Sequence, residues 1–272
     1  MERRRYVIKN KKNEWRFPEK RKVFLENQNL FARNILEILE NYNLINNKNI
    51  SILNIRTEAG SILNILKKAG LKNTYGVDYF PENIEYARSA FGLDNTKILT
   101  GHDYLDSNNM KYDLILANPT FTHAYNPLDL FIRIRGMLKE GGVVLSYNEM
   151  NHKETWKLNP FNAGLNAFHK QFPTENSIRN AFSLSGFSVE SIKHPKGMKF
   201  ASVHNGIMSI LRRSDHDDVK ILNDDLSEIK NIFNQWWQRH QKIKNKKLFI
   251  NKLGIYKIRG KINALRSFAR LR

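Results

Sequence analysis

Polar residues follow the ends of four apolar runs that are typical of buried parallel strands. They are the Arg56–Gly60 turn after the first run, Asp78 after the second, Asp103 after the third and Asn118 after the fourth. In an open parallel sheet, ligands bind beyond the carboxyl ends of the strands, where the strand order reverses. A carboxylate after the second strand can accept both hydroxyl groups of a ribose. The pattern therefore indicates a site for a nucleoside-containing ligand.

The turn after the first run is unusual for such a site. A nucleotide-binding turn normally contains several glycines, because the backbone approaches the ligand closely and adopts positive φ. Here Arg56 and Glu58 occupy the turn and only Gly60 remains. A side chain at positive φ costs about 1–2 kcal/mol. The sequence leaves two alternatives: Arg56 and Glu58 either fill the space of the ligand or bind it through their charges.

Alternating strand and helix patterns position these residues. The predicted strands are 50–55, 74–78, 96–100, 112–117 and 142–148. The predicted helices between them are 60–69, 81–90 and 126–138, with Gly141-Gly142 as a helix stop. This alternation favours the doubly wound α/β class with right-handed crossovers.

Helical patterns also flank this region. Residues 24–42 have one apolar face, and the segment after Thr174 reads as a capped helix that ends at Gly186 and leads into a strand. A last strand is predicted within 200–213, and an amphipathic helix over 224–250.

The composition excludes several classes of protein. The chain of 272 residues has no cysteine, which excludes disulfide frameworks, zinc–thiolate sites, iron–sulfur clusters and a cysteine nucleophile. No secretory signal is recognisable at the N-terminus, and the apolar runs are far shorter than the roughly 18–20 residues of a membrane span. The sequence predicts a cytoplasmic protein without a metal site.

The positive charge is concentrated at the two ends. Residues 1–22 carry +7 and residues 239–272 carry +12, which together account for the whole formal net charge of +19. Basic ends bind nucleic acid or anionic membranes. Residues 248–272 mix Lys and Arg with many apolar side chains, which favours peripheral binding to the inner face of an anionic membrane over nucleic acid.

Four segments in this order resemble the class I S-adenosylmethionine-dependent methyltransferases, in particular the small-molecule and sugar methyltransferases of bacterial surface-polysaccharide pathways. The segments are 52–70, 75–88, 112–146 and 172–189. The resemblance covers roughly residues 30–195. It implies a Rossmann-like, seven-stranded, mostly parallel sheet with helices on both faces. The implied organisation is a basic arm and N-terminal helix (1–48), a methyltransferase-like domain (49–214), and an amphipathic helix with a basic tail (215–272).

The resemblance implies S-adenosylmethionine as the cofactor. Asp78 matches the acidic ribose ligand of the family, and Asp103 matches its acid on the adenine side. Arg56 and Glu58 stand at two glycines of the family's D-x-G-x-G-x-G turn, where Arg56 would meet the methionine carboxylate and Glu58 the ammonium or the sulfonium. The implied cofactor-binding residues are Asn54, Arg56, Glu58, Gly60, Asp78, Tyr79, Asp103 and Asn118.

Methyl transfer needs mainly alignment, because the sulfonium is already activated. A general base helps where the acceptor is a hydroxyl, and His123 and His169 are the candidates for it. The predicted function is methyl transfer to a small-molecule or sugar-like acceptor of a polysaccharide pathway.

Two other functions remain open from the sequence. The altered turn is compatible with an inactive, methyltransferase-like binding protein. Asn118-Pro119-Thr120-Phe121 resembles the N-P-P-Y/F turn of amino-group methyltransferases, and with the basic ends it leaves an N-methyltransferase acting on nucleic acid or protein as a further alternative.

Overall fold

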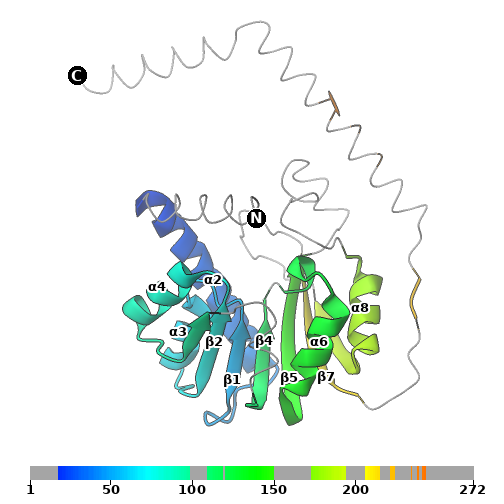
Figure 1. The fold of residues 1–272 in the computed structure, drawn as a ribbon, viewed down its shortest axis with the longest axis horizontal. Helices are drawn as coiled ribbons and strands as arrows, with labels where there is room; N and C mark the ends of the chain where they lie inside the picture. Colours follow the sequence, from blue (N-terminus) through cyan, green and yellow to red (C-terminus); the bar gives the residue numbers. More distant parts are fainter. Residues whose placement is uncertain are drawn as a thin grey trace, which may run out of the picture. The chain divides into compact units, whose positions relative to one another are not determined.

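A computed structural model of the chain describes residues 18–98, 109–118, 120–149, 173–193, 206–214 and 221–223, together with 234, 238, 241 and 242. Within these ranges the strands form one sheet in the order β3-β2-β1-β4-β5-β7-β6 (Figure 1). The strands are β1 Ile52–Ile55, β2 Thr74–Asp78, β3 Thr96–Ile98, β4 Tyr112–Ala117, β5 Leu138–Glu149, β6 Phe187–Lys193 and β7 Gly206–Arg213. β7 is antiparallel to β5 and β6, and the other neighbours are parallel.

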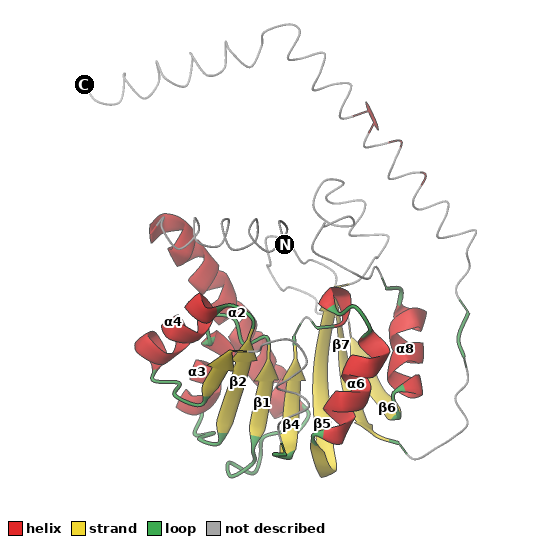
Figure 2. Cartoon of the chain, viewed as in Figure 1, coloured by secondary structure: helices red, strands yellow, loops and turns green. Residues whose placement is uncertain are grey.

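Helices cover both faces of the sheet (Figure 2). They are α2 Pro18–Asn41, α3 Ser61–Lys68, α4 Pro81–Phe91, the short 3-10 helix η1 Phe121–His123, α6 Pro127–Gly136 and α8 Glu175–Leu184. Successive residues of β1 point to opposite faces: Ile52 packs with α2 and α3, whereas Leu53 packs with α6 and α8. Strands buried on both faces explain the continuous apolar runs of the sequence. The predicted α/β fold with a mostly parallel sheet is confirmed.

One predicted boundary is wrong. Gly141-Gly142 was expected to stop a helix, but α6 ends at Gly136 and β5 begins at Leu138, so both glycines lie within the strand. The β4–β5 register shifts there. Gly141 has φ +69, and a Cβ on Gly142 would lie 2.9 Å from the carbonyl oxygen of Lys139. The glycines therefore allow an irregularity within β5.

The predicted helix cap at Thr174 is confirmed. Thr174 Oγ1 accepts a hydrogen bond from the Ser177 N–H at 3.1 Å, and Ser177 Oγ accepts one from the Thr174 N–H at 2.7 Å. This reciprocal capping box starts α8, and Gly186 follows its end at φ +77.

Several predicted segments lie outside the described residues. They include the basic arm before Pro18, Asp103, His169, the tail 248–272 and most of 224–250, of which the four described residues are helical. None of the described helices is long and apolar enough to cross a membrane.

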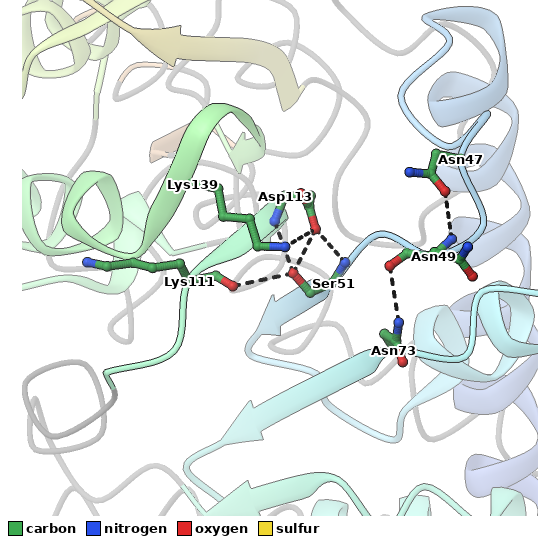
Figure 3. Close-up of polar contacts among 7 residues, drawn as sticks. All are labelled: Asn47, Asn49, Ser51, Asn73, Lys111, Asp113 and Lys139. Atoms are coloured by element: carbon green, nitrogen blue, oxygen red, sulfur yellow. Dashed lines mark hydrogen bonds and ion pairs between the residues drawn. The ribbon is translucent and has the colours of Figure 1, made fainter.

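At the amino-terminal ends of the strands, side chains of neighbouring strands are joined by hydrogen bonds (Figure 3). Asp113 Oδ2 accepts hydrogen bonds from the Ser51 N–H at 2.7 Å, from Ser51 Oγ at 2.8 Å and from Lys139 Nζ at 2.7 Å. These contacts join the beginnings of β1, β4 and β5. Asp113 therefore holds together the amino-terminal ends of these strands, at the end of the sheet opposite the expected ligand site.

We expect Asp113→Asn to lower the free energy of unfolding by only about 1 kcal/mol at pH 7, because the side chains of Lys139 and Asp113 are 45% and 32% exposed. Partial burial raises the pKa of the Asp113 carboxyl, but hydrogen bonds from Lys139 and Ser51 and the charge of Lys139 outweigh it, so the net pKa is lowered. A lowered pKa stabilises the fold above the unfolded-state pKa, about 3.9, and the gain disappears as pH falls through the folded-state pKa.

Urea denaturation between pH 7 and pH 3 measures this difference, with Asp94→Asn, at an exposed carboxylate, as the control. The difference between wild type and Asp113→Asn should shrink as the pH falls below about 4. A pH-independent difference would contradict the assignment.

Candidate functional site

The strand order reverses between β1 and β4, which makes the carboxyl ends of these strands the expected ligand position. Ile55, the last residue of β1, pairs with Ala117, the last residue of β4. The turn that begins at Arg56 and the side chain of Asn118 therefore leave the sheet at the same level. The structure thus brings together Arg56 and Asn118, two of the residues that the sequence predicts for the site.

The turn after β1 keeps the backbone shape of a glycine-rich turn although it contains two charged residues. The φ angles of Arg56, Glu58 and Gly60 are +60°, +48° and +83°. Of the three described non-glycine residues with positive φ, two lie in this turn. Left-handed backbone at a bulky residue is strained by about 1–2 kcal/mol and is concentrated at functional sites. Arg56 and Glu58 thus adopt the conformation that the replaced glycines would have.

Gly60 fixes how closely the two neighbouring helices approach the turn. Its N–H donates to the Thr57 carbonyl oxygen at 2.9 Å, and α3 begins at the next residue. A Cβ on Gly60 would lie 2.8 Å from Ala87 Cβ of α4 and 2.8 Å from Leu93 Cδ1. Gly60 is therefore required by both its backbone conformation and its packing.

Asp78 is buried beneath the turn and is bonded within the protein. Its Oδ2 accepts the Glu58 N–H at 2.8 Å, and its Oδ1 accepts the Phe80 N–H and Asn83 Nδ2, each at 2.9 Å. Only 2% of the residue is exposed. A carboxylate offers about four acceptor positions, so about one remains for a hydroxyl. Asp78 as a ribose ligand stays a prediction, and in this arrangement it can take one hydroxyl rather than two.

Glu58 reaches helix α2. Its carboxylate accepts a hydrogen bond from the side-chain amide of Gln28, a buried residue 30 positions earlier in the chain. Sequence reasoning did not identify Gln28, because an amide within a helical repeat gives no signal of a contact so distant in the chain. The contact ties the N-terminal helix to the turn.

Tyr79 lies close to the charge of Arg56. Partial burial raises the pKa of the Tyr79 phenol, while Arg56 lowers it and Asp78 raises it further. The net direction is upward, so the phenol stays neutral near neutral pH. With 47% of its surface exposed, Tyr79 presents an aromatic face and a hydroxyl beside the turn.

Buried polar atoms without hydrogen-bond partners gather at the ends of β1 and β4. Asn54 is fully buried and Asn118 is 2% exposed. Asn54 Nδ2 donates to Thr57 Oγ1 at 3.2 Å, but Asn54 Oδ1 and both amide atoms of Asn118 have no partner in the described part of the protein. Thr120 Oγ1 and Thr122 Oγ1 are also buried without a hydrogen-bond partner among the described residues. Leaving such groups unpaired costs about 1–3 kcal/mol each, which a bound polar ligand would offset.

The catalytic predictions remain untested. His123 is the last residue of η1, is partly exposed, and lies six residues after Ala117, the last residue of β4. His169 and Asp103 lie outside the described ranges. Among the residues that are described, no group of His, Asp and Glu could hold a metal ion.

Residues 23–192 match the family of methyltransferase domains. The chain belongs to this family. The match runs from α2, which contains Gln28, into β6, and the fold is that of the class I S-adenosylmethionine-dependent methyltransferase superfamily. No curated protein matches the sequence.

Solved methyltransferase structures share this fold at low identity. Magnesium protoporphyrin IX methyltransferase from Synechocystis, solved with bound S-adenosylhomocysteine, is 14% identical with a TM-score of 0.54 over 75% of this chain and 95% of that chain. A methyltransferase from Archaeoglobus fulgidus is 13% identical with a TM-score of 0.53 over 70% and 98%. One from Clostridium acetobutylicum is 16% identical with a TM-score of 0.50 over 68% and 91%. These likenesses support the fold of the domain and leave its acceptor open.

Proposed function

We propose that this methyltransferase-domain protein binds S-adenosylmethionine and transfers its methyl group to a small-molecule or sugar-like acceptor. The observation that carries the proposal is the backbone of the turn after β1. Positive φ at Arg56, Glu58 and Gly60 preserves the shape of a cofactor turn at the expense of strain in two charged residues. Backbone strain of this kind is concentrated at functional sites.

The residues beyond the carboxyl ends of the parallel strands fit the cofactor. Asn54 Oδ1 and the amide atoms of Asn118, which have no partner among the described residues, lie beside the turn, where the methionine end would be held, and Arg56 would meet its carboxylate. The remaining acceptor position of Asp78 suits one ribose hydroxyl. Tyr79 would contact the nucleoside, as would Asp103.

The bound cofactor supplies a methyl group that is already activated as a sulfonium. The protein contributes orientation of the acceptor and exclusion of water, and a base is needed only where the acceptor is a hydroxyl. His123 follows β4 on η1 and is our first candidate for that base, with His169 as the second.

Two alternatives each have an observation in their favour. The internal bonds of Asp78 and the side chain of Glu58 in the turn favour an inactive binding protein. The buried amide of Asn118, which has no partner among the residues that the structure describes, favours an amino-group acceptor in nucleic acid or protein. Both alternatives are separated from the main proposal by ligand binding and by an acceptor screen.

Asn118→Leu tests the cofactor site, with isothermal titration calorimetry against S-adenosylmethionine and S-adenosylhomocysteine as the measurement. We expect wild type to bind both with Kd values of roughly 1–100 μM. The variant should bind at least about tenfold more weakly, because it loses hydrogen bonds to the ligand. Its free energy of unfolding should be unchanged or about 1 kcal/mol higher, because a buried unpaired amide is removed.

Absence of heat with wild type at millimolar ligand would support the inactive binding protein instead. A loss of stability in Asn118→Leu without a change in Kd would show that the amide serves the fold. Transfer of labelled methyl from S-adenosylmethionine to nucleotide sugars, compared with oligonucleotides and peptides, distinguishes the acceptor classes.

A further inference from the structure

Glu58 places a carboxylate in the turn beyond the carboxyl ends of the parallel strands. Its carboxylate is bonded to the neutral amide of Gln28 and makes no ion pair within the described part of the chain. This is notable in a protein with 45 Lys and Arg against 26 Asp and Glu. A carboxylate that is bonded only to a neutral amide keeps its charge, and a cationic group of a ligand can pair with it.

Two contacts hold this charge in place. The N–H of Glu58 is bonded to Asp78 Oδ2 at 2.8 Å, and its carboxylate is bonded to Gln28 of α2. Its backbone is left-handed, at φ +48°. Glycine at this position would avoid the strain. The side chain is therefore placed in the turn at the cost of backbone strain.

The same edge carries independent evidence of a ligand. Asn54, four residues before Glu58, and Asn118 at the end of β4 are at least 98% buried and have amide atoms without partners among the described residues. These amides and the carboxylate of Glu58 are the groups that would surround the methionine end of the cofactor. A role of Glu58 at the methionine end rests on the proposed function.

The cofactor and its product differ in charge at that end. S-adenosylmethionine has a positive sulfonium, whereas S-adenosylhomocysteine has a neutral thioether, and both carry the ammonium and the carboxylate. A fixed carboxylate in a site of reduced dielectric attracts the more positive ligand more strongly. We propose that Glu58 is a specificity-determining residue that favours S-adenosylmethionine over S-adenosylhomocysteine by charge, which would limit inhibition by the product.

Glu58→Gln tests this proposal in the full chain. Glutamine keeps an acceptor for Gln28 and the same size, so only the charge is removed. Calorimetry gives the Kd of S-adenosylmethionine, of S-adenosylhomocysteine and of sinefungin, a non-transferable analogue with an amine in place of the sulfonium. We expect the preference for S-adenosylmethionine over S-adenosylhomocysteine to fall by roughly tenfold in the variant. The affinity for sinefungin should fall together with that for S-adenosylmethionine.

Glu140→Gln is the matched control, because Glu140 is an exposed carboxylate near the start of β5 at the opposite edge. It should leave the preference unchanged. Glu58→Gly, which restores the residue usual in the family, should lose the preference as Glu58→Gln does, and it serves as the second variant if Glu58→Gln does not fold.

The outcomes separate the inference from the proposed function. If wild type and both Glu58 variants bind the two ligands with the same preference, Glu58 does not discriminate by charge and the proposed function still stands. If Glu58 variants weaken both ligands equally, Glu58 only shapes the turn and the inference is overturned. If wild type binds neither ligand, the proposed function fails and the inference fails with it.

Discussion

Asp78→Ala should destabilise the protein by about 3–5 kcal/mol, because one buried carboxylate satisfies three donors and the loss of a partner costs about 1–3 kcal/mol for each buried group. The donors are the N–H groups of Glu58 and Phe80 and the side-chain amide of Asn83. They belong to the turn after β1 and to the beginning of α4. The variant should therefore loosen both elements that border the cofactor site.

Urea denaturation measures the loss, and Asp94→Ala, at an exposed aspartate, is the control with an expected effect below about 0.5 kcal/mol. Asp78→Asn should lie between wild type and Asp78→Ala, because one of its two side-chain acceptors is retained. A loss below about 1 kcal/mol in Asp78→Ala would show that the three donors find other partners. Loss of cofactor binding in this variant would not by itself identify Asp78 as a ribose ligand, since the turn itself depends on Asp78.

The sequence was sufficient for the α/β class and for the positions of the first strands because the signal is local and repeated. Each apolar run, such as 112–117, is short, and each is followed by a turn and a helix with one apolar face. Buried parallel strands with helical crossovers leave few alternative topologies. The position of the site followed from the topology, since the carboxyl ends of β1 and β4 meet where the strand order reverses.

The failed expectation at Gly141-Gly142 has a different cause. Two glycines after an apolar helix are a common helix stop, and the sequence pattern cannot distinguish that from an irregular strand. The difference is decided by β4, whose register with β5 shifts between Tyr112 and Leu114. That pairing is a tertiary contact, and the local sequence around Gly141-Gly142 gives no signal of it.

The side-chain contacts within the site also could not be predicted from the sequence. The sequence left open whether Arg56 and Glu58 fill the space of the ligand or bind it through their charges. The structure retains positive φ at both residues. Part of the reason lies outside the turn, because Asp78 holds the N–H of Glu58 and Gln28 holds its carboxylate. Side-chain bonds between residues 20 and 30 positions apart follow from packing rather than from periodicity.

These contacts bear on how ligand binding and folding are linked. Gln28 belongs to the N-terminal helix, Glu58 to the turn and Asp78 to β2. One continuous set of bonds therefore connects α2 with the start of α4 through the turn. A ligand that contacts the turn should stabilise these elements together, since binding to the native state adds to its stability by mass action.

Gly60→Ala is expected to cost about 3 kcal/mol in the free energy of unfolding, through left-handed strain and overlap of the new methyl group. The Cβ would lie 2.8 Å from Ala87 Cβ, and φ is +83°. Because Ala87 is a fully buried residue of α4, relief requires α3 and α4 to move apart. That movement would displace the turn, so the affinity for S-adenosylmethionine should fall as well.

Gly70→Ala separates the two contributions. Gly70 has φ +90°, but a Cβ there meets no atom within 4 Å, so this variant should lose only the strain energy of about 1 kcal/mol. The difference between the two variants in urea denaturation measures the overlap at Gly60. Equal losses in the free energy of unfolding would mean that α4 moves aside at no energetic cost. The close packing of α3 against α4 would then not determine the conformation of the turn. A larger loss in Gly60→Ala, together with weaker cofactor binding, would show that the packing of Gly60 against α4 holds the cofactor turn in position.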